Sequence, residues 1–326
     1  MFAFVDHYEP DSVENVLQWR DGLRKLSNLY RDREGNPPKH TWFYHGEDEA
    51  ILHALSECSI EGLGEIEMHL HHGNDTEKSL ADLIDKRLTL YNKFGACITQ
   101  KGERKFGFIH GKWGLANSRG KKYCGVRNEI DILYKAGCYA DFTFPAWGLM
   151  NPRKKNALFY PSCKWHFGKP YTAGFDVTLG MPKDGFMLIE GPGSISGLPG
   201  SLSRYGLLRK IVSPISPGID NYFVPTPARF DCWVRSGVCV KGRPEWIFIK
   251  VHTHGAREKN HEACFGRIIG EIYRYALQKY NNSTTYQMHF VTAREMFNII
   301  KAAESGFHEN PGLYRDHCIG RYKNSI

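Results

Sequence analysis

Short apolar runs alternate with longer amphipathic stretches along the 326-residue chain. Period-two or continuous apolar runs predict strands at residues 2–5, 41–44, 65–69, 106–109, 139–142, 185–189, 246–252 and 287–291. Apolar spacing with a period of 3.6 predicts helices at residues 12–29, 47–58, 76–93, 126–136, 258–279 and 293–304. Thr292 ahead of Glu295 forms a capping box at the start of the last helix. This alternation predicts an α/β fold in which βα units build a parallel sheet.

The stretch 144–235 differs from the rest because it is rich in Pro, Gly and Ser. It either decorates the sheet as an insertion or contains short strands that the pattern does not resolve. No internal repeat appears and no linker divides the chain. We therefore expect one domain over residues 1–326, with elaborated loops in that stretch.

Composition narrows the class of protein. The chain is 41% hydrophobic and 13% aromatic, and it contains no low-complexity tract, which excludes intrinsic disorder. No apolar run reaches the roughly 20 residues that a membrane-spanning helix needs. The first residues contain no signal-peptide core, so we expect a cytoplasmic protein. The nine cysteines form no C-x-x-C pair, and we expect free thiols rather than a disulfide framework.

The formal charge of +8 is spread thinly. Its densest patches are the short basic clusters at residues 119–122 and 153–155, which suit a solvated surface or an anionic ligand better than nucleic acid. The chain contains no Walker loop, G-x-S-x-G elbow or H-E-x-x-H motif, and the glycine-rich run 191–200 lacks the lysine of a phosphate cradle. Nucleotide-driven chemistry therefore has no support in the sequence.

Chemically useful side chains follow the first predicted strand. Asp6 and His7 come directly after the apolar run, where parallel α/β folds bind their ligands. A metal ligand or a general base would be well placed at this point. A turn that begins at the aspartate and ends at Pro10 is the alternative.

Three histidines lie within four residues at the end of the third predicted strand: His69, His71 and His72. Alternation puts His69 and His71 on one face of the strand, and a following turn can bring His72 to the same point. Imidazole is the commonest metal ligand, so this segment predicts a metal site. An exposed histidine patch is the alternative.

Other predicted strands also end in polar or aromatic residues. His252 and His254 alternate at one strand end, where a general acid or a further ligand is the natural role. The others are His45, His110, Lys112, Trp113 and Asp141. Exposed indole rings suit stacking on sugars, which makes Trp113 and Trp147 candidates for carbohydrate binding.

Taken in order, these segments resemble the polysaccharide deacetylase family, also called the nodulation-type chitooligosaccharide deacetylase homology domain. Asp6-His7 resembles that family's Asp-Asp pair, and Glu65-Ile-Glu67-Met-His69 with His71 and His72 resembles its histidine motif. Residues 141–145 and 252–254 resemble its later motifs. His7 stands where the family has a metal-binding aspartate. The resemblance covers roughly residues 1–300 and rests on order and context more than on identical motifs.

The resemblance implies an irregular (β/α)7-type barrel and a metal-dependent hydrolase that deacetylates an N- or O-acetylated sugar or polysaccharide precursor. It implies a divalent metal, Zn²⁺ first, held by His7, His69 and one or both of His71 and His72. Asp6 would then activate the bound water and His254 would protonate the leaving amine. His252, His110, Trp113 and Asp141 would contact the carbohydrate.

Two other functions remain open at the level of sequence. The chain could be a catalytically inactive glycan-binding barrel, or a metal-dependent hydrolase of another bond, such as a phosphoester or a glycosidic link. The basic clusters would suit an anionic substrate in the second case. The sequence does not indicate the oligomeric state.

Overall fold

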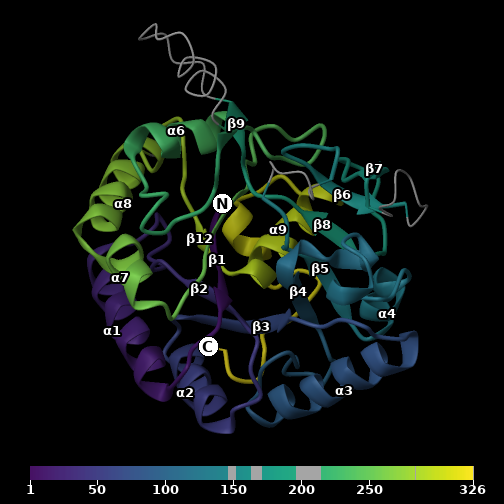
Figure 1. Cartoon of the computed structure of the whole chain (residues 1–326). Coiled ribbons are helices and arrows are strands. Elements are labelled where there is room, and N and C mark those ends of the chain that lie inside the picture. Colours follow the sequence, from purple (N-terminus) through teal and green to yellow (C-terminus); the bar gives the residue numbers. More distant parts are fainter. Residues whose placement is uncertain (146–151, 163–170, 196–213, 283, 326) are drawn as a thin grey trace, which may run out of the picture.

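The computed structural model describes residues 1–145, 152–162, 171–195, 214–282 and 284–325. Within these ranges, ten strands form one curled sheet (Figure 1). The strands are β1 (Phe2–Tyr8), β2 (His40–Tyr44), β3 (Gly64–Leu70), β4 (Phe106–His110), β5 (Cys138–Asp141), β6 (Leu158–Pro161), β7 (Gly174–Asp176), β8 (Met187–Ile189), β11 (Ile249–Thr253) and β12 (Phe290–Val291). A separate pair comprises β9 (Ser194–Ile195) and β10 (Pro214–Ile215).

Strand order in the sheet is β11-β1-β2-β3-β4-β5-β8-β6-β7, and β12 pairs with β1. Pairing is parallel from β11 to β8, whereas β6 runs antiparallel to both β8 and β7. The curled, mostly parallel sheet agrees with the predicted irregular α/β barrel in outline, but within the described residues it does not close on itself and forms a half-barrel. Short antiparallel strands from the loop-rich stretch end the sheet instead.

Helices surround the convex side of the sheet (Figure 1). They are α1 (Val13–Leu29), α2 (Glu49–Ile60), α3 (Glu77–Lys93), α4 (Glu129–Lys135), α6 (Pro227–Arg235), α7 (Glu258–Phe265) and α8 (Arg267–Tyr280). Short 3₁₀ helices are η1 (Gly111–Trp113), η2 (Leu115–Asn117), η3 (Lys121–Tyr123) and η4 (Pro311–Tyr314). None of the described helices combines the length and the apolar character that crossing a bilayer requires.

Helix α9 (Ala293–Glu304) lies inside the curled sheet (Figure 1), and all of its residues except Lys301 are buried. Because side chains alternate between the two faces of each strand, the sheet contributes residues to two hydrophobic cores, one on each face. Residues such as Phe4 and Trp42 pack toward the outer helices, whereas Val5 and Phe43 pack toward α9. The helix fills the space that a barrel interior would enclose.

Most predicted elements are confirmed. The last helix has the predicted bounds and the predicted capping box between Thr292 and Glu295. The helix predicted at 258–279 is two helices, because the extended backbone of Gly266 ends α7 and precedes α8. The loop-rich stretch contains β6, β7 and α6, which the pattern did not resolve. The eight described cysteines are free thiols, and Cys163 lies outside the described residues.

Candidate active site

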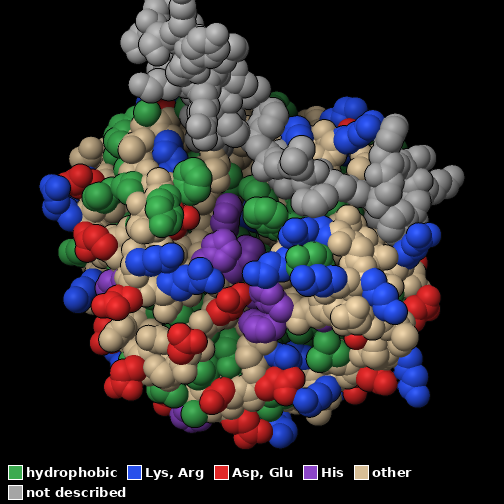
Figure 2. Space-filling model, viewed as in Figure 1, with side chains coloured by type: hydrophobic (Ala, Val, Ile, Leu, Met, Phe, Trp, Pro, Cys, Tyr) green, Lys and Arg blue, Asp and Glu red, His purple; other side chains and the backbone are tan. Residues whose placement is uncertain are grey.

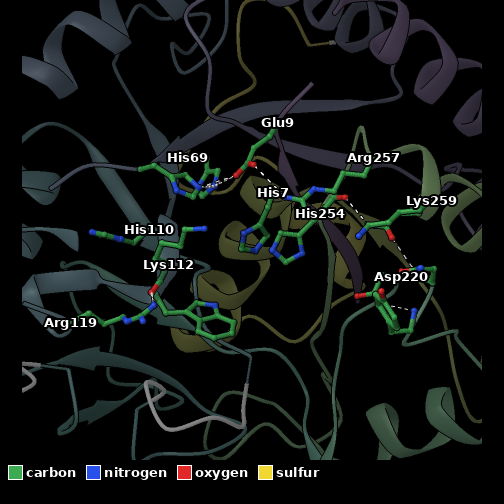
Figure 3. A pocket seen from close by; sticks show the side chains of 15 residues that line it. His7, Glu9, His69, His110, Lys112, Arg119, Asp220, His254, Arg257 and Lys259 are labelled. Atoms are coloured by element: carbon green, nitrogen blue, oxygen red, sulfur yellow. Dashed lines mark hydrogen bonds and ion pairs between the residues drawn. The ribbon is translucent and has the colours of Figure 1, made fainter. Parts of the chain in front are cut away.

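A pocket of about 380 Å³ opens at the carboxyl ends of β1, β3, β4 and β11. Five histidines line it: His7, His69, His71, His110 and His254. Figure 2 shows histidine side chains gathered in a central hollow with Lys and Arg beside them, and Figure 3 shows the lining side chains converging on it. The fold thus brings together residues from distant parts of the sequence at the edge where parallel sheets bind ligands.

Three of the lining side chains meet at one point, and we call them the pocket cluster: Glu9, His69 and His71. The Glu9 Oε1 atom lies 2.9 Å from His71 Nε2 and 3.2 Å from His69 Nε2. The two imidazole nitrogens are 3.0 Å apart. Ligand atoms around a tetrahedral zinc ion are about 3.3 Å apart, given metal–ligand distances of about 2.0–2.1 Å. The donor set and its spacing therefore fit a divalent metal.

The orientation of His69 also suits a ligand. Its Nδ1 donates to the carbonyl oxygen of Ile109 at 2.9 Å, because a carbonyl can only accept. That bond fixes the proton on Nδ1 and leaves the Nε2 lone pair directed at the cluster. The side chain of His69 is 1% exposed, whereas those of His71 and Glu9 are each 29% exposed. The cluster is anchored on one side and open to the pocket on the other.

His7 and His254 stand beside the pocket cluster with their ring centroids 4.8 Å apart (Figure 3). The His7 ring lies 5.4 Å from that of His69. Burial lowers the pKa of His7 well below its ordinary value, and burial followed by the charge of Arg257 lowers the pKa of His254. Both imidazoles are therefore neutral near pH 7 and able to accept a proton.

The rim of the pocket is cationic. Lys112, Arg119, Arg257 and Lys259 line it, against the carboxylates of Glu9 and Asp220 (Figure 3). The Arg257 guanidinium is 3.7 Å from Glu9, which takes up part of that charge. Two exposed aromatic rings join the rim: Trp113, 42% exposed, and Tyr222, 79% exposed. This rim favours a ligand with negative charge and a flat apolar face.

His72 does not join the pocket cluster. Its Nδ1 is 2.9 Å from Asp75 Oδ2, and its Nε2 is 2.9 Å from Glu129 Oε1. Since β3 ends at Leu70, the chain turns after His71 and carries His72 toward α4. Of the two alternatives left open by the sequence, the structure therefore places His71, and not His72, beside His69.

Asp6 lies away from the pocket, beneath α1. Its carboxylate accepts from Trp19 Nε1 at 3.1 Å and from the Gly255 amide at 2.6 Å. It is fully buried, and burial raises its pKa. A side chain at Gly255 would collide with this carboxylate, which explains the glycine. Alternation turns Asp6 to the opposite face from His7, and Asp6 is not among the described residues that line the pocket.

The remaining predicted residues divide in the same way. Trp113 and His254 line the pocket, whereas Asp141 and His252 are not among its described lining residues. Asp141 is buried and accepts from the Thr143 amide and hydroxyl at 3.0 Å and 2.6 Å. His252 stands behind His7, with 5.8 Å between their ring centroids. Trp147 lies outside the described residues.

Glu9 is a possible metal ligand in the pocket that the sequence prediction did not include. It stands two residues after His7, on the same side of the extended β1 backbone. Period-two alternation pairs His7 with Glu9 and excludes Asp6. The signal was present in the sequence, but the strand was predicted to end at Val5, which hid the alternation.

Fold and pocket together define an α/β protein with a histidine-rich site at the carboxyl ends of its parallel strands. Neither the models of known protein families nor the curated proteins include a match to this chain. A solved structure from Mycobacterium smegmatis, provisionally described as a polysaccharide deacetylase, is similar with a TM-score of 0.37 and 11% sequence identity. The match covers 79% of this chain and 70% of that chain. The function is therefore inferred from this chain's own residues.

Proposed function

We propose that this protein is a metal-dependent hydrolase that deacetylates a carbohydrate. The observation that carries the proposal is the pocket cluster, in which a carboxylate and two imidazole nitrogens converge within 3.2 Å at the bottom of an open pocket. Two histidines and one carboxylate with an open position form a donor set used by hydrolytic zinc enzymes. Zn²⁺ is accordingly the metal that we expect, held by Glu9, His69 and His71.

A divalent ion bound there would supply Lewis-acid activation of a water molecule or of an acyl carbonyl. The chain's own residues would manage the protons. His254 and His7 are neutral and face the cluster, so a ring nitrogen of either can take a proton from the attacking water. The same imidazolium can then give that proton to the leaving group. His254 replaces Asp6 in this scheme as the first candidate for the base.

The rim supports the carbohydrate part of the proposal. Trp113 and Tyr222 offer exposed rings on which the apolar face of a sugar can stack. The resemblance of the strand-end motifs to the polysaccharide deacetylase family points to the same class of substrate. The four rim cations favour a sugar that also carries a carboxylate or a phosphate.

The direct test combines metal analysis with an assay for released acetate on a panel of acetylated amino sugars, with and without a negative charge. Glu9→Gln keeps the size of the side chain and removes its charge, so we expect loss of both metal and turnover. Glu57→Gln on the exposed side of α2 is the matched control. Wild-type protein that binds no divalent metal, or an unaffected Glu9→Gln variant, would contradict the proposal.

One alternative has an observation in its favour. The cationic rim would also suit phosphoester hydrolysis, in which Lys112, Arg119, Arg257 and Lys259 would face a phosphate. Phosphate esters in the same panel separate this reaction from deacetylation. Binding of glycans with no turnover of either substrate class would select the inactive glycan-binding protein.

A further inference from the structure

A second group of possible ligands lies at the wall of the pocket, which His110 lines, and we call it the buried cluster: His72, His110, Cys124 and Glu129. One ligand atom from each lies within 4.8 Å of the others. The side chain of His72 is 2% exposed, and those of His110 and Glu129 are fully buried, as is Cys124. The proposed reaction uses none of these four as a ligand or as a base.

Both histidines direct the same kind of atom at the cluster. His110 Nδ1 donates to the carbonyl of Gly111 at 2.6 Å, so this nitrogen carries the proton. His72 Nδ1 faces the Asp75 carboxylate at 2.9 Å, which makes it a donor as well. The Nε2 atoms of both rings therefore point inward. A carboxylate or carbonyl that orients a histidine in this way is the usual outer shell of a metal ligand.

His110 Nε2 supplies a second and independent observation. It is buried and has no hydrogen-bond partner within the described part of the chain. It nevertheless lies 3.4 Å from Glu129 Oε1, an atom that also faces His72 Nε2 at 2.9 Å. A nitrogen lone pair directed at a carboxylate oxygen is unfavourable in a buried site unless a cation lies between them.

We propose that the buried cluster is a second, closed metal site, which takes Zn²⁺ or a similar thiophilic divalent ion. Cys124 Sγ lies 3.4 Å from Glu129 Oε2, and ligand atoms of a tetrahedral zinc site lie about 3.3–3.8 Å apart. Binding releases the thiol proton of Cys124 to solvent. The thiolate and the Glu129 carboxylate then balance the two charges of the ion.

This site would hold one wall of the pocket in place. His110 and Cys124 flank the 3₁₀ segments η1 to η3, and Glu129 Oε2 accepts from the Ala116 amide within them at 2.6 Å. The same segment carries Lys112, Trp113 and Arg119 to the rim. Four ligands with no open position are typical of a structural site, in contrast to the open pocket cluster.

The test is substitution with Co²⁺, which gives an intense near-ultraviolet charge-transfer band only when a thiolate binds it. We expect two equivalents of metal per wild-type chain and a band that saturates with one of them. Cys124→Ala should lose one equivalent and the whole band. Cys138→Ala, another buried cysteine, should keep both. His71→Ala should lose the other equivalent and keep the band, because the pocket cluster contains no sulfur.

Wild-type protein that binds Co²⁺ without the band would overturn the second site, and this measurement needs no variant. Retention of the band in Cys124→Ala would overturn it equally. Neither result bears on the metal site proposed at the pocket cluster. That proposal would be contradicted if His71→Ala kept its turnover and both equivalents of metal. The two proposals therefore fail separately.

Discussion

The pocket cluster takes both of its histidines from residues 69–72, and the buried cluster takes one of its two, His72, from the same segment, yet the two clusters differ in exposure to solvent. His69 and His71 lie on one face of β3 and its extension, and they leave the pocket cluster open on one side. His72 comes after the strand has ended and points to α4, where the buried cluster is closed from solvent. One short motif thus serves two sites, because strand alternation and a turn send neighbouring side chains in different directions.

The two clusters differ in their access to solvent, and this difference bears on their function. A catalytic metal needs a position free for water or substrate, and a structural metal needs none. Glu9 and His71 each keep 29% of their side chain exposed, whereas Glu129 and His110 are fully buried. We therefore expect chemistry at the pocket cluster and rigidity from the buried cluster.

Alanine variants of the two adjacent histidines should separate these roles. For His71→Ala we expect kcat/KM to fall on the order of 10³-fold, because a lost metal removes several kcal/mol of transition-state stabilisation. Compared with wild-type protein in the absence of added metal, its thermal stability should change little, since the ring is partly exposed. For His72→Ala we expect a large loss of stability, because Glu129 and Asp75 lose a buried partner.

Acetate release and thermal melts on both variants check this prediction. His53→Ala is the matched control, because this histidine is 68% exposed on α2. Equal losses of activity and equal losses of stability in the two variants would remove the distinction between the clusters.

Much of the fold could be predicted from the sequence, because its signals are local. Eight of the strands needed only an apolar run, and α9 needed only its capping box and a 3.6-residue period. The pattern could not predict that α9 would lie inside the sheet. The polar residues of this helix are buried through pairing with distant segments, as in the ion pair between Arg294 and Glu65. Such a pairing leaves no local signal in the sequence.

The location of the candidate site could be predicted from the sequence, but the residues that form its ligand set could not. Strand ends correctly indicated His7, His69, His71 and His254 as neighbours of one pocket. The ligand set depends on how each strand ends, which periodicity fixes only within a few residues. A strand assumed to end at Val5 favoured Asp6, whereas the strand that continues to Tyr8 favours Glu9.

Chelation should remove metal from the two clusters at different rates. A chelator can reach the pocket cluster directly, but the buried cluster must first open locally. We expect turnover to be lost in a fast phase, as metal leaves the pocket cluster. The stability that the buried cluster's metal contributes should be lost in a slow phase, by about 2.7 kcal/mol where free metal had been at a hundredfold excess over the dissociation constant of that site. Metal content, activity and melting temperature followed over time check both phases, and a single common phase would contradict the comparison.

A variant of Asp6 tests whether the residues on one face of β1 support stability while those on the other face support turnover. Asp6→Asn replaces one acceptor oxygen by an amide, which leaves either Trp19 Nε1 or the Gly255 amide without a partner. We expect the free energy of unfolding to fall by about 2 kcal/mol, the cost of a buried unpaired donor. Turnover of the folded protein should stay within about threefold, whereas removal of a general base costs about 10²–10⁴-fold.

Chemical denaturation and kcat measurements on the same preparation distinguish these outcomes. Asp21→Asn on the exposed side of α1 is the control, and its stability should change by less than about 0.5 kcal/mol. A stable Asp6→Asn variant with no turnover would return Asp6 to the role of base.

The rim cations should give the smallest effect, one that belongs to the pocket cluster alone. Lys259→Gln removes one charge from the rim without touching either cluster. For an anionic acetylated sugar we expect KM to rise about fivefold, or about 1 kcal/mol, because the charges interact through a largely aqueous medium. The effect should shrink as salt is added, and kcat should not change. Lys86→Gln, an exposed lysine paired with Glu47, is the control. If KM for the anionic sugar stays the same while KM for a neutral sugar rises, the rim recognises shape rather than charge. The substrate class would then have to be inferred from the aromatic residues Trp113 and Tyr222 instead.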